Sequence, residues 1–229
     1  MTTGRMHTRH ELSAAALALF AEFGHESTTV DQIAARAGVA RRTFFRYFAS
    51  KDDAVLPDHD TTVGTVQAVL EGAAPTEEPL AVVCRAIREV LRMYTADPSM
   101  SLARYRLLRQ VPALREREIA VVSRYERLFT KYLLSHPSVS GVDPDSTTAM
   151  LAEVSASAVV ASHNHVLRRW LRTGATGDAM SRLDEALAVI RRRFSPSADD
   201  EAPGDIVVTV VPGGTHTSDV LDAVRRALD

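Results

Sequence analysis

The stretch that decides the fold is TVDQIAARAGVARRTFFRYFASK, residues 29–51. It predicts two short helices on either side of Gly38, because a tight turn that needs a positive φ costs a glycine little. Thr29 and Gln32 fit a capping box, in which a hydroxyl and an amide three residues later satisfy the first free N–H groups of a helix. The apolar positions that would pack these helices together are Ile33, Ala34, Ala37, Val39, Phe44 and Phe48.

The second helix of this pair would carry basic residues on its outward side. Between Arg36 and Lys51 the sequence holds five basic residues and no acidic one. In a helix-turn-helix the second helix enters the major groove of DNA, where arginine pairs well with guanine. The outward residues would be Arg41, Arg42, Thr43, Arg46 and Tyr47, followed by Lys51 as a phosphate ligand. Charge and spacing alone fit equally well an ordinary helical hairpin with a solvated basic face.

Helical spacing continues on both sides of this stretch. An apolar stripe predicts a helix over about 9–23, which ends at Gly24. Ser50 and Asp53 resemble a cap that opens a helix reaching about Gly72, and Pro57 should kink or interrupt it. Proline and glycine punctuation predicts the remaining helices, over about 79–96, 99–111, 113–135, 145–173 and 178–194.

This pattern predicts an all-α protein with three parts. Residues 1–50 would form a three-helix DNA-binding head, and residues 51–194 a helical body for ligand binding and dimerisation. Residues 195–229 would form a C-terminal tail that starts with a polar linker. The β-branched run 206–211 predicts a short strand in this tail, and 217–228 a final helix.

Composition sets the class of protein. The chain has 229 residues, 45% of them hydrophobic and 24% charged, with a net charge of −2. These values are ordinary for a soluble globular protein, and the sequence has neither a secretory signal nor a long apolar run, so no membrane role is expected. The single cysteine, Cys84, suits a reducing compartment. The expected location is the cytoplasm.

Residues 8–56 resemble the TetR family of bacterial regulators. The residues that carry the resemblance are Ala18, Leu19, Phe20, Gly24, Thr29, Val30, Ile33, Ala34, Ala37, Gly38, Val39, Thr43, Phe44, Tyr47, Phe48, Ser50 and Lys51. The resemblance implies an all-α homodimer that binds a palindromic operator. By position, it implies base contacts from Arg41, Arg42, Thr43 and Arg46, and phosphate contacts from Tyr47 and Lys51. Two departures are Ala40, where the family often has a serine-like cap, and Phe45, where a tyrosine is common.

The apolar helices between 79 and 134 would enclose a cavity for a small-molecule effector. The expected lining residues are Leu91, Tyr94, Tyr105, Leu108, Arg109, Tyr125 and Phe129, although for any single apolar or aromatic one of them plain core packing is the better explanation. Seven arginines crowd 104–127, and guanidinium is the natural partner of a carboxylate or phosphate. The stretch 104–129 also resembles an acyl-coenzyme-A-responsive branch of the family. Together these features suggest an amphipathic anionic effector such as a fatty acyl-CoA.

The helix over 145–173 is rich in small residues, which let helix axes approach closely. They are Ala152, Ser155, Ala156, Ser157, Ala158, Ala161 and Ser162, with Trp170 and Leu171 at one edge. Because the family pairs its last two long helices across a two-fold axis, we expect this helix and the 178–194 helix to form a homodimer interface. The alternative is a helix packed only within its own chain.

Other classes of protein are less well supported. The sequence has no nucleophile elbow, zinc-protease motif, phosphate loop or Cys-x-x-Cys pair, so we expect neither an enzyme nor a cofactor. His163 and His165 are two residues apart on a predicted helix and therefore face in different directions, so no metal site is expected. The predicted function is a repressor released from DNA by a ligand. A regulator without a ligand, an activator, or an enzyme on a helical scaffold remain alternatives.

Overall fold

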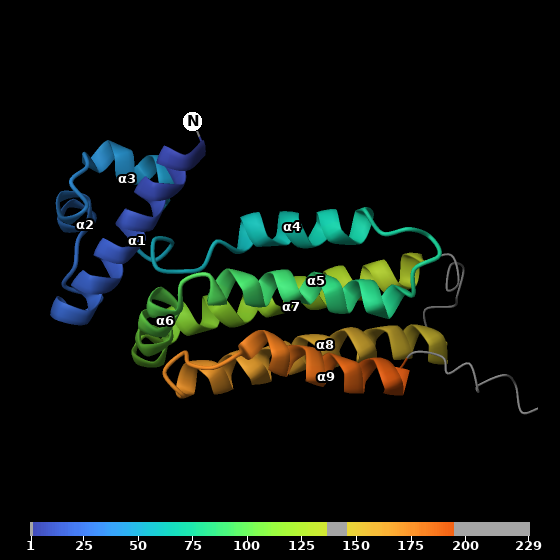
Figure 1. Cartoon of the computed structure of the whole chain (residues 1–229). Helices are drawn as coiled ribbons and strands as arrows, with labels where there is room; N and C mark the ends of the chain where they lie inside the picture. Colours follow the sequence, from blue (N-terminus) through green and yellow to red (C-terminus); the bar gives the residue numbers. More distant parts are fainter. Residues whose placement is uncertain (1, 137–145, 195–229) are drawn as a thin grey trace, which may run out of the picture. The chain divides into compact units, whose positions relative to one another are not determined.

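The computed structural model describes residues 2–136 and 146–194, and every regular element within these ranges is a helix (Figure 1). The all-α prediction is therefore confirmed for this part of the chain. None of its helices is both long and apolar enough to cross a bilayer. The strand expected at 206–211 and the helix expected at 217–228 lie outside the described residues.

Three helices form the N-terminal head. They are α1 (Thr2–Phe23), α2 (Val30–Arg36) and α3 (Arg41–Tyr47). α1 begins well before the expected start near Arg9, because no proline interrupts the preceding residues. It ends where expected, at Gly24, whose φ of +83° is a left-handed conformation that favours glycine.

In the link between head and body, no helix opens at Ser50, contrary to the prediction, but the predicted interruption at Pro57 is confirmed. Residues 51–56 form turns and a bend, and α4 (His59–Glu71) begins only after Pro57. Proline lacks an N–H donor and disfavours helical backbone in the residue before it, so the helix cannot run through this position. The carboxylate of Asp58 then caps α4 by accepting a hydrogen bond from the backbone N–H of Thr61 at 3.2 Å.

The other five helices match the predicted ranges to within a residue or two. They are α5 (Pro79–Thr95), α6 (Pro98–Gln110), α7 (Pro112–Ser135), α8 (Thr147–Arg172) and α9 (Ala179–Phe194). α5, α6 and α7 each start with a proline, which suits the first helical position because its N–H would lack a helical partner anyway. These local signals explain why the boundaries could be predicted.

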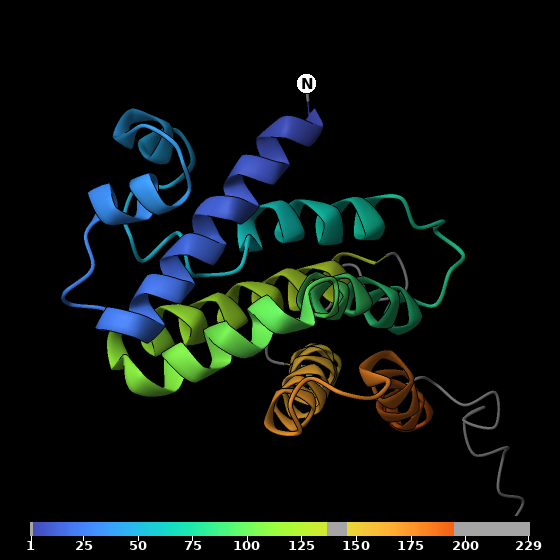
Figure 2. The same cartoon turned by 60° about the vertical axis from the view of Figure 1, so that its left-hand side comes forward.

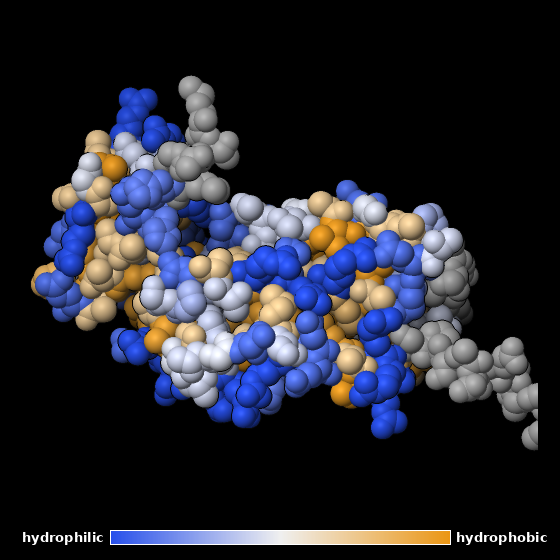
Figure 3. All heavy atoms as spheres, in the orientation of Figure 1, coloured by the Kyte–Doolittle hydropathy of each residue, from blue (hydrophilic) through white to orange (hydrophobic). Residues whose placement is uncertain are grey.

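The body is layered around α5. In Figures 1 and 2, α4 covers one side of α5 and α7, and α8 and α9 cover the other, in agreement with the helix contacts. α5 is buried on most of its surface, with Val82, Val83 and Leu91 fully enclosed. Figure 3 shows that the body surface seen in this view mixes hydrophilic residues with small apolar patches. The core therefore lies between the helices.

A second core joins the head to the body. Leu12, Phe20 and Phe44 of the head are buried in one cluster with residues of α6 and α7. The residues from the body are Met100, Leu107 and Leu114. The described residues up to Phe194 accordingly form one compact unit, in which the head rests on α6 and the start of α7.

Candidate nucleic-acid interface and internal cavity

The turn between α2 and α3 has the geometry predicted from the sequence. The Thr29 hydroxyl accepts a hydrogen bond from the backbone N–H of Gln32 at 3.3 Å, and the Gln32 side-chain oxygen accepts one from the backbone N–H of Thr29 at 2.7 Å. Gly38 has a φ of +67°, as the tight turn requires. Ile33 and Phe44 are fully buried against α1. Their burial fixes which face of α3 points outward.

The outward face of α3 is basic. Arg41, Arg42 and Arg46 are exposed, whereas Thr43 and Tyr47 are half-buried. The Arg41 guanidinium pairs with Asp31 of α2 and lies over the ring of Phe45, 5.4 Å from its centroid. The Arg46 guanidinium lies 5.1 Å from the centroid of the Tyr47 ring.

These contacts hold the arginines only weakly, because exposed ion pairs contribute about 0–1 kcal/mol. The guanidinium groups therefore stay available to a polyanion.

Lys51 is placed differently from the other predicted DNA contacts. Its ammonium donates hydrogen bonds to the backbone carbonyls of His25, at 2.6 Å, and Thr28, at 3.1 Å. It therefore closes the segment between α1 and α2, a structural role that the sequence did not indicate. An ammonium has three donors, so a phosphate contact would have to use the third.

Carboxylates of the linker fasten the head to α7. Arg117 of α7 pairs with Asp53 and lies 3.7 Å from a carboxylate oxygen of Asp52. The other Asp52 oxygen lies 2.7 Å from Nε2 of His25. Burial alone would raise the pKa of Asp53, but the hydrogen bonds from Arg117 and Ser50 outweigh it and lower that pKa. Asp53 thus stays ionised beside the guanidinium.

Two further arginines reach the linker from other helices. Nε of Arg104, on α6, donates to the backbone carbonyl of Val55 at 2.9 Å. Arg9, on α1, lies 3.2 Å from the carboxylate of Asp58 and donates to the backbone carbonyl of Tyr47 at the end of α3. The side chain of Arg9 therefore contacts both the C-terminal end of α3 and the N-terminal end of α4.

A small internal cavity of about 20 Å³ lies among α4, α5, α7 and α8. Its polar residues are His59, Tyr94, Glu118, Tyr125, His163 and Asn164, and its apolar residues are Ile87, Val90, Val121, Val122 and Val160. The cavity thus combines apolar walls with a few polar groups, as ligand sites do.

Glu118 organises the polar side of this cavity. Its carboxylate accepts a hydrogen bond from the hydroxyl of Tyr94 at 2.5 Å and lies 3.2 Å from Nε2 of His59. Burial alone would raise the pKa of Glu118, but the hydrogen bonds from His59 and Tyr94 outweigh it and lower that pKa. Glu118 therefore remains a carboxylate at neutral pH.

Two of the seven predicted ligand-binding residues line the cavity, Tyr94 and Tyr125. Leu91 and Phe129 are fully buried in the same core but do not border it. Tyr105 is half-buried, and the guanidinium of the exposed Arg109 lies over its ring, 5.9 Å from the centroid. Leu108 packs against the core that joins the head to the body. None of the seven clustered arginines lines the cavity.

Nine of the eleven lining residues are not among the seven predicted effector contacts. His59, Glu118 and His163 show why. They lie on different helices and far apart in the chain, so no local spacing connects them. In the sequence, His163 and His59 stand out only as potential metal ligands, and neither has a defined set of partners. Among the described residues, no cluster of acidic, histidine or cysteine side chains is placed to hold a metal ion.

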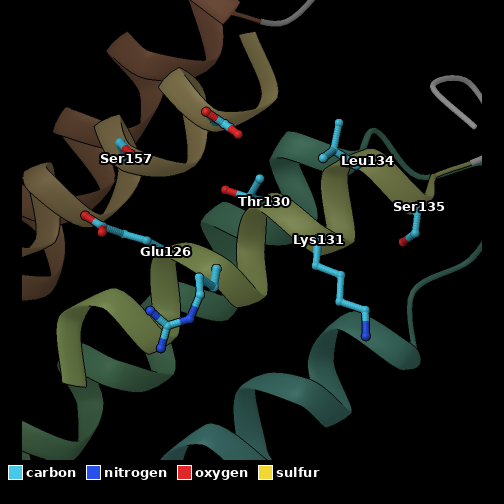
Figure 4. Close-up of a pocket in the computed structure, with 8 residues that line it drawn as sticks. Glu126, Thr130, Lys131, Leu134, Ser135 and Ser157 are labelled. Atoms are coloured by element: carbon cyan, nitrogen blue, oxygen red, sulfur yellow. The ribbon is translucent and has the colours of Figure 1, made fainter. Parts of the chain in front are cut away.

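An open groove of about 710 Å³ runs between α7 and α8 on the surface (Figure 4). Its lining is mixed in charge, with two acidic and two basic side chains among hydroxyl and apolar ones: Glu126, Glu153, Arg127 and Lys131. This groove is exposed to solvent, unlike the internal cavity.

A three-helix head with a basic outward helix, on a helical body with a buried cavity, defines the class of helix-turn-helix transcriptional regulators. Comparison with known proteins agrees. The model for bacterial regulatory proteins of the tetR family matches residues 12–56, and the model for the MftR C-terminal domain matches residues 77–195. The chain therefore belongs to the TetR family, with a C-terminal domain of the MftR type.

Single proteins of known name share between 16% and 37% of their residues with this chain over the aligned parts. The regulator TcmR of Streptomyces glaucescens is 37% identical over 113 residues, which are 47% of this chain and only 50% of TcmR. The putative mycofactocin biosynthesis regulator MftR of Mycobacterium tuberculosis is 29% identical over 72% of this chain and 82% of its own. The fatty acid degradation regulator FadR of Bacillus halodurans shares the fold, with a TM-score of 0.55 at 16% identity over 80% of this chain and 93% of that one.

Proposed function

We propose that this protein is a repressor that binds operator DNA through α3 and leaves it when a small molecule enters the internal cavity. The observation that carries the proposal is the row of exposed guanidiniums on α3, Arg41, Arg42 and Arg46, in the position of a recognition helix. A helix that presents arginines at its outward face matches the major groove in shape and chemistry.

The DNA contacts follow from the placement of each side chain. Arg41, Arg42, Thr43 and Arg46 would contact base edges, because they lie on the outward face of α3 or at its border. Tyr47 and Lys51 would contact phosphates, which fix the register of the protein on DNA without reading sequence. Lys51 would do so while it also holds the carbonyls of His25 and Thr28.

The outer sides of α8 and α9 support a homodimer. Met150 and Val154 of α8 and Val189 of α9 are exposed apolar residues. Of the small residues expected in the interface, Ser157 and Ala161 lie on this outer side, whereas Ala152, Ser155 and Ala156 are buried within the chain, as is Trp170. Pairing about a two-fold axis would match a palindromic operator.

The effector would act in the cytoplasm, where the operator is. A fatty acyl-CoA was the candidate that the arginine cluster suggested. FadR of Bacillus halodurans, a fatty acid degradation regulator, has a similar fold, but a similarity at 16% identity extends to the fold alone. Because Arg104, Arg117 and Arg124 contact Val55, Asp53 and Asp60, three of the seven arginines already have partners in the linker and α4.

The test is a gel shift with the DNA that flanks the protein's own gene, repeated with candidate effectors that include long-chain acyl-CoA. We expect a specific complex that at least one compound dissociates. Arg46→Ala should weaken the complex, whereas Arg172→Ala, an exposed arginine at the end of α8, should not. Failure to prefer any of these sequences over random DNA would overturn the proposal.

Thermal melts and transcription in vitro, added to the gel shift, separate the alternatives. A regulator without an effector would bind the operator but respond to no compound in either DNA affinity or melting temperature. An activator would bind upstream of a promoter and raise transcription in vitro. We infer a regulator rather than an enzyme, because the family is one of transcription factors.

A further inference from the structure

The side chain of His163 carries an unused hydrogen-bonding atom in the internal cavity. His163 is 4% exposed and lines the cavity from α8. Its Nδ1 lies 3.2 Å from the side-chain oxygen of Asn164. Its Nε2 is buried and has no hydrogen-bond partner among the described residues. Buried polar atoms are nearly always paired with a protein group or an ordered water, so this nitrogen marks a position in the cavity where a ligand can replace a water as the partner.

The chemistry of Nε2 follows from its neighbour. Because an amide oxygen is only an acceptor, Nδ1 of His163 must carry the proton that the hydrogen bond to Asn164 needs. Burial lowers the pKa of His163 to about 4, so the imidazole is neutral at pH 7. In a neutral imidazole only one nitrogen is protonated, which makes Nε2 an acceptor. The missing partner is therefore a donor, such as a hydroxyl or an N–H group.

The charge of the cavity restricts the ligand further. Glu118 is ionised and lies on the same cavity, where it already accepts hydrogen bonds from Tyr94 and faces His59. A second negative charge would meet this carboxylate in a low-dielectric environment, where like charges repel strongly. No arginine or lysine lines the cavity to compensate. An anionic head group is therefore disfavoured here.

The walls of the cavity favour a flat apolar molecule. Five of its lining residues are valine or isoleucine. The polar residues are mainly rings: His59 lies 6.2 Å from Tyr94 and 6.0 Å from Tyr125, and Tyr94 lies 6.2 Å from His163, measured between ring centroids. These rings already pair with one another at such separations, and together they offer aromatic surface that a ring of the ligand could contact.

We propose that the effector is an uncharged hydroxylated aromatic compound whose hydroxyl donates a hydrogen bond to Nε2 of His163. This proposal rests on the proposed function and names the ligand class of the same site. Val121, Val122 and Asn164 are half-buried, which places the route from solvent between α7 and α8. Because the cavity measures only about 20 Å³, these helices and α4 must separate to admit a ring.

The test uses phenol, 1-naphthol and 4-phenylphenol, each compared with its methyl ether and with the carboxylate on the same ring system. Binding to the full-length protein is measured by calorimetry at pH 7.5. We expect at least one phenol to bind, and its ether and carboxylate to bind at least tenfold more weakly, since the ether lacks the donor and the carboxylate carries the charge. His163→Phe should reduce the difference between phenol and ether to less than threefold.

His165→Phe is the matched control, because His165 is exposed on the same helix two residues away. It should leave the tenfold preference unchanged. The comparison of phenol with ether in the unmodified protein holds even if His163→Phe fails to fold. The inference is overturned if none of the phenols binds, or if ethers or carboxylates bind as tightly. If another compound, such as acyl-CoA, then releases the operator, the proposed function survives and only the ligand class is wrong.

Discussion

At the scale of single residues, Arg117 and Glu118 show how one turn of α7 serves two purposes. Arg117 is exposed and pairs with the linker carboxylate of Asp53, whereas Glu118 turns inward to His59 at the start of α4. The two neighbours thus hold successive parts of the segment that joins head and body. A ligand that moves Glu118 would therefore act directly beside Arg117, which holds the linker through Asp53.

His163 makes the stability of the protein depend on pH. Burial lowers its pKa from 6.5 to about 4, so the unfolded chain binds this proton more readily than the folded protein between these two values. Above pH 6.5 this group therefore does not change the free energy of unfolding with pH. As the pH falls from 6.5 toward 4, the free energy of unfolding decreases. The expected loss is about 3 kcal/mol by pH 4. Urea unfolding at pH 7, 6, 5 and 4 measures it.

His163→Phe should flatten this dependence, and the comparison must be with the unmodified protein, because other titratable groups face His163. They are His59 on α4, Tyr94 on α5 and Glu118 on α7. Glu118, whose pKa is lowered, adds its own loss of stability only below its unfolded pKa of 4.5. An unchanged slope between pH 6.5 and 4.5 in the variant would show that His163 is not the responsible group.

Arg46 and Lys51 should differ in what their removal costs. Arg46→Ala should weaken operator binding by about 1–3 kcal/mol and relax base preference at one position, with no change in melting temperature. Lys51→Ala should lower the free energy of unfolding by about 1–3 kcal/mol, because the carbonyls of His25 and Thr28 lose a charged donor. Titrations against a library of operator variants, with thermal melts, test both. A purely phosphate-binding Lys51 would leave the melt unchanged.

At the scale of elements, the turn that sets α3 against α2 depends on Gly38. An added Cβ would meet no atom within 4 Å, but the φ of +67° is strained for any residue with a side chain. Gly38→Ala should therefore cost about 1–2 kcal/mol of stability through the backbone alone. Gly64→Ala is the control, since Gly64 lies exposed inside α4 with ordinary helical φ, and alanine should stabilise it by roughly 0.5–1 kcal/mol. Equal effects in urea unfolding would contradict this account.

The sequence predicted the elements well wherever the signal was local. The capping box of Thr29 and Gln32 and the prolines at 79, 98 and 112 act on their own helix starts, so a window of a few residues contains the whole cause. α4 starts later than predicted because Pro57 outweighs the cap pattern at Ser50. The turns before Pro57 are held by contacts from Arg104 and Arg117, which the sequence pattern does not reveal.

The cavity was harder to predict than the helices. Glu118 and His163 line the same cavity because α7 and α8 pack side by side, and no periodicity in either helix marks which of its polar residues face inward. The clustered arginines suggested an anion site, but Arg104 and Arg117 are used by the linker instead. Composition indicates which groups are present, whereas tertiary packing decides which of them meet.

At the scale of the whole molecule, the described part of one chain leaves an apolar strip on α8 unpaired. Met150 is 55% exposed, and Val154 is 44% exposed one turn further along. The strip continues through Ser157 and Ala161, small residues that allow another helix to approach closely. Two copies that pair here would cover apolar surface on both and place two α3 helices on one DNA.

Val154→Glu should therefore turn the dimer into a monomer, because each interface would bury two carboxylates near the two-fold axis. Operator affinity should then fall by more than about tenfold, since a single head holds one half-site without the gain from a linked second head. Sedimentation velocity measures the mass, and gel shifts on full and half operators measure the affinity.

Ile119→Glu supplies the control, because Ile119 is 59% exposed on α7 and its replacement adds the same charge away from the α8 strip. This variant should remain dimeric and bind the operator normally. Far-ultraviolet circular dichroism distinguishes dissociation from unfolding, since a folded monomer keeps its helices. A Val154→Glu protein that stays dimeric with full affinity would move the interface elsewhere, and the groove between α7 and α8, lined by Glu153 and Ser157, would be the next surface to substitute.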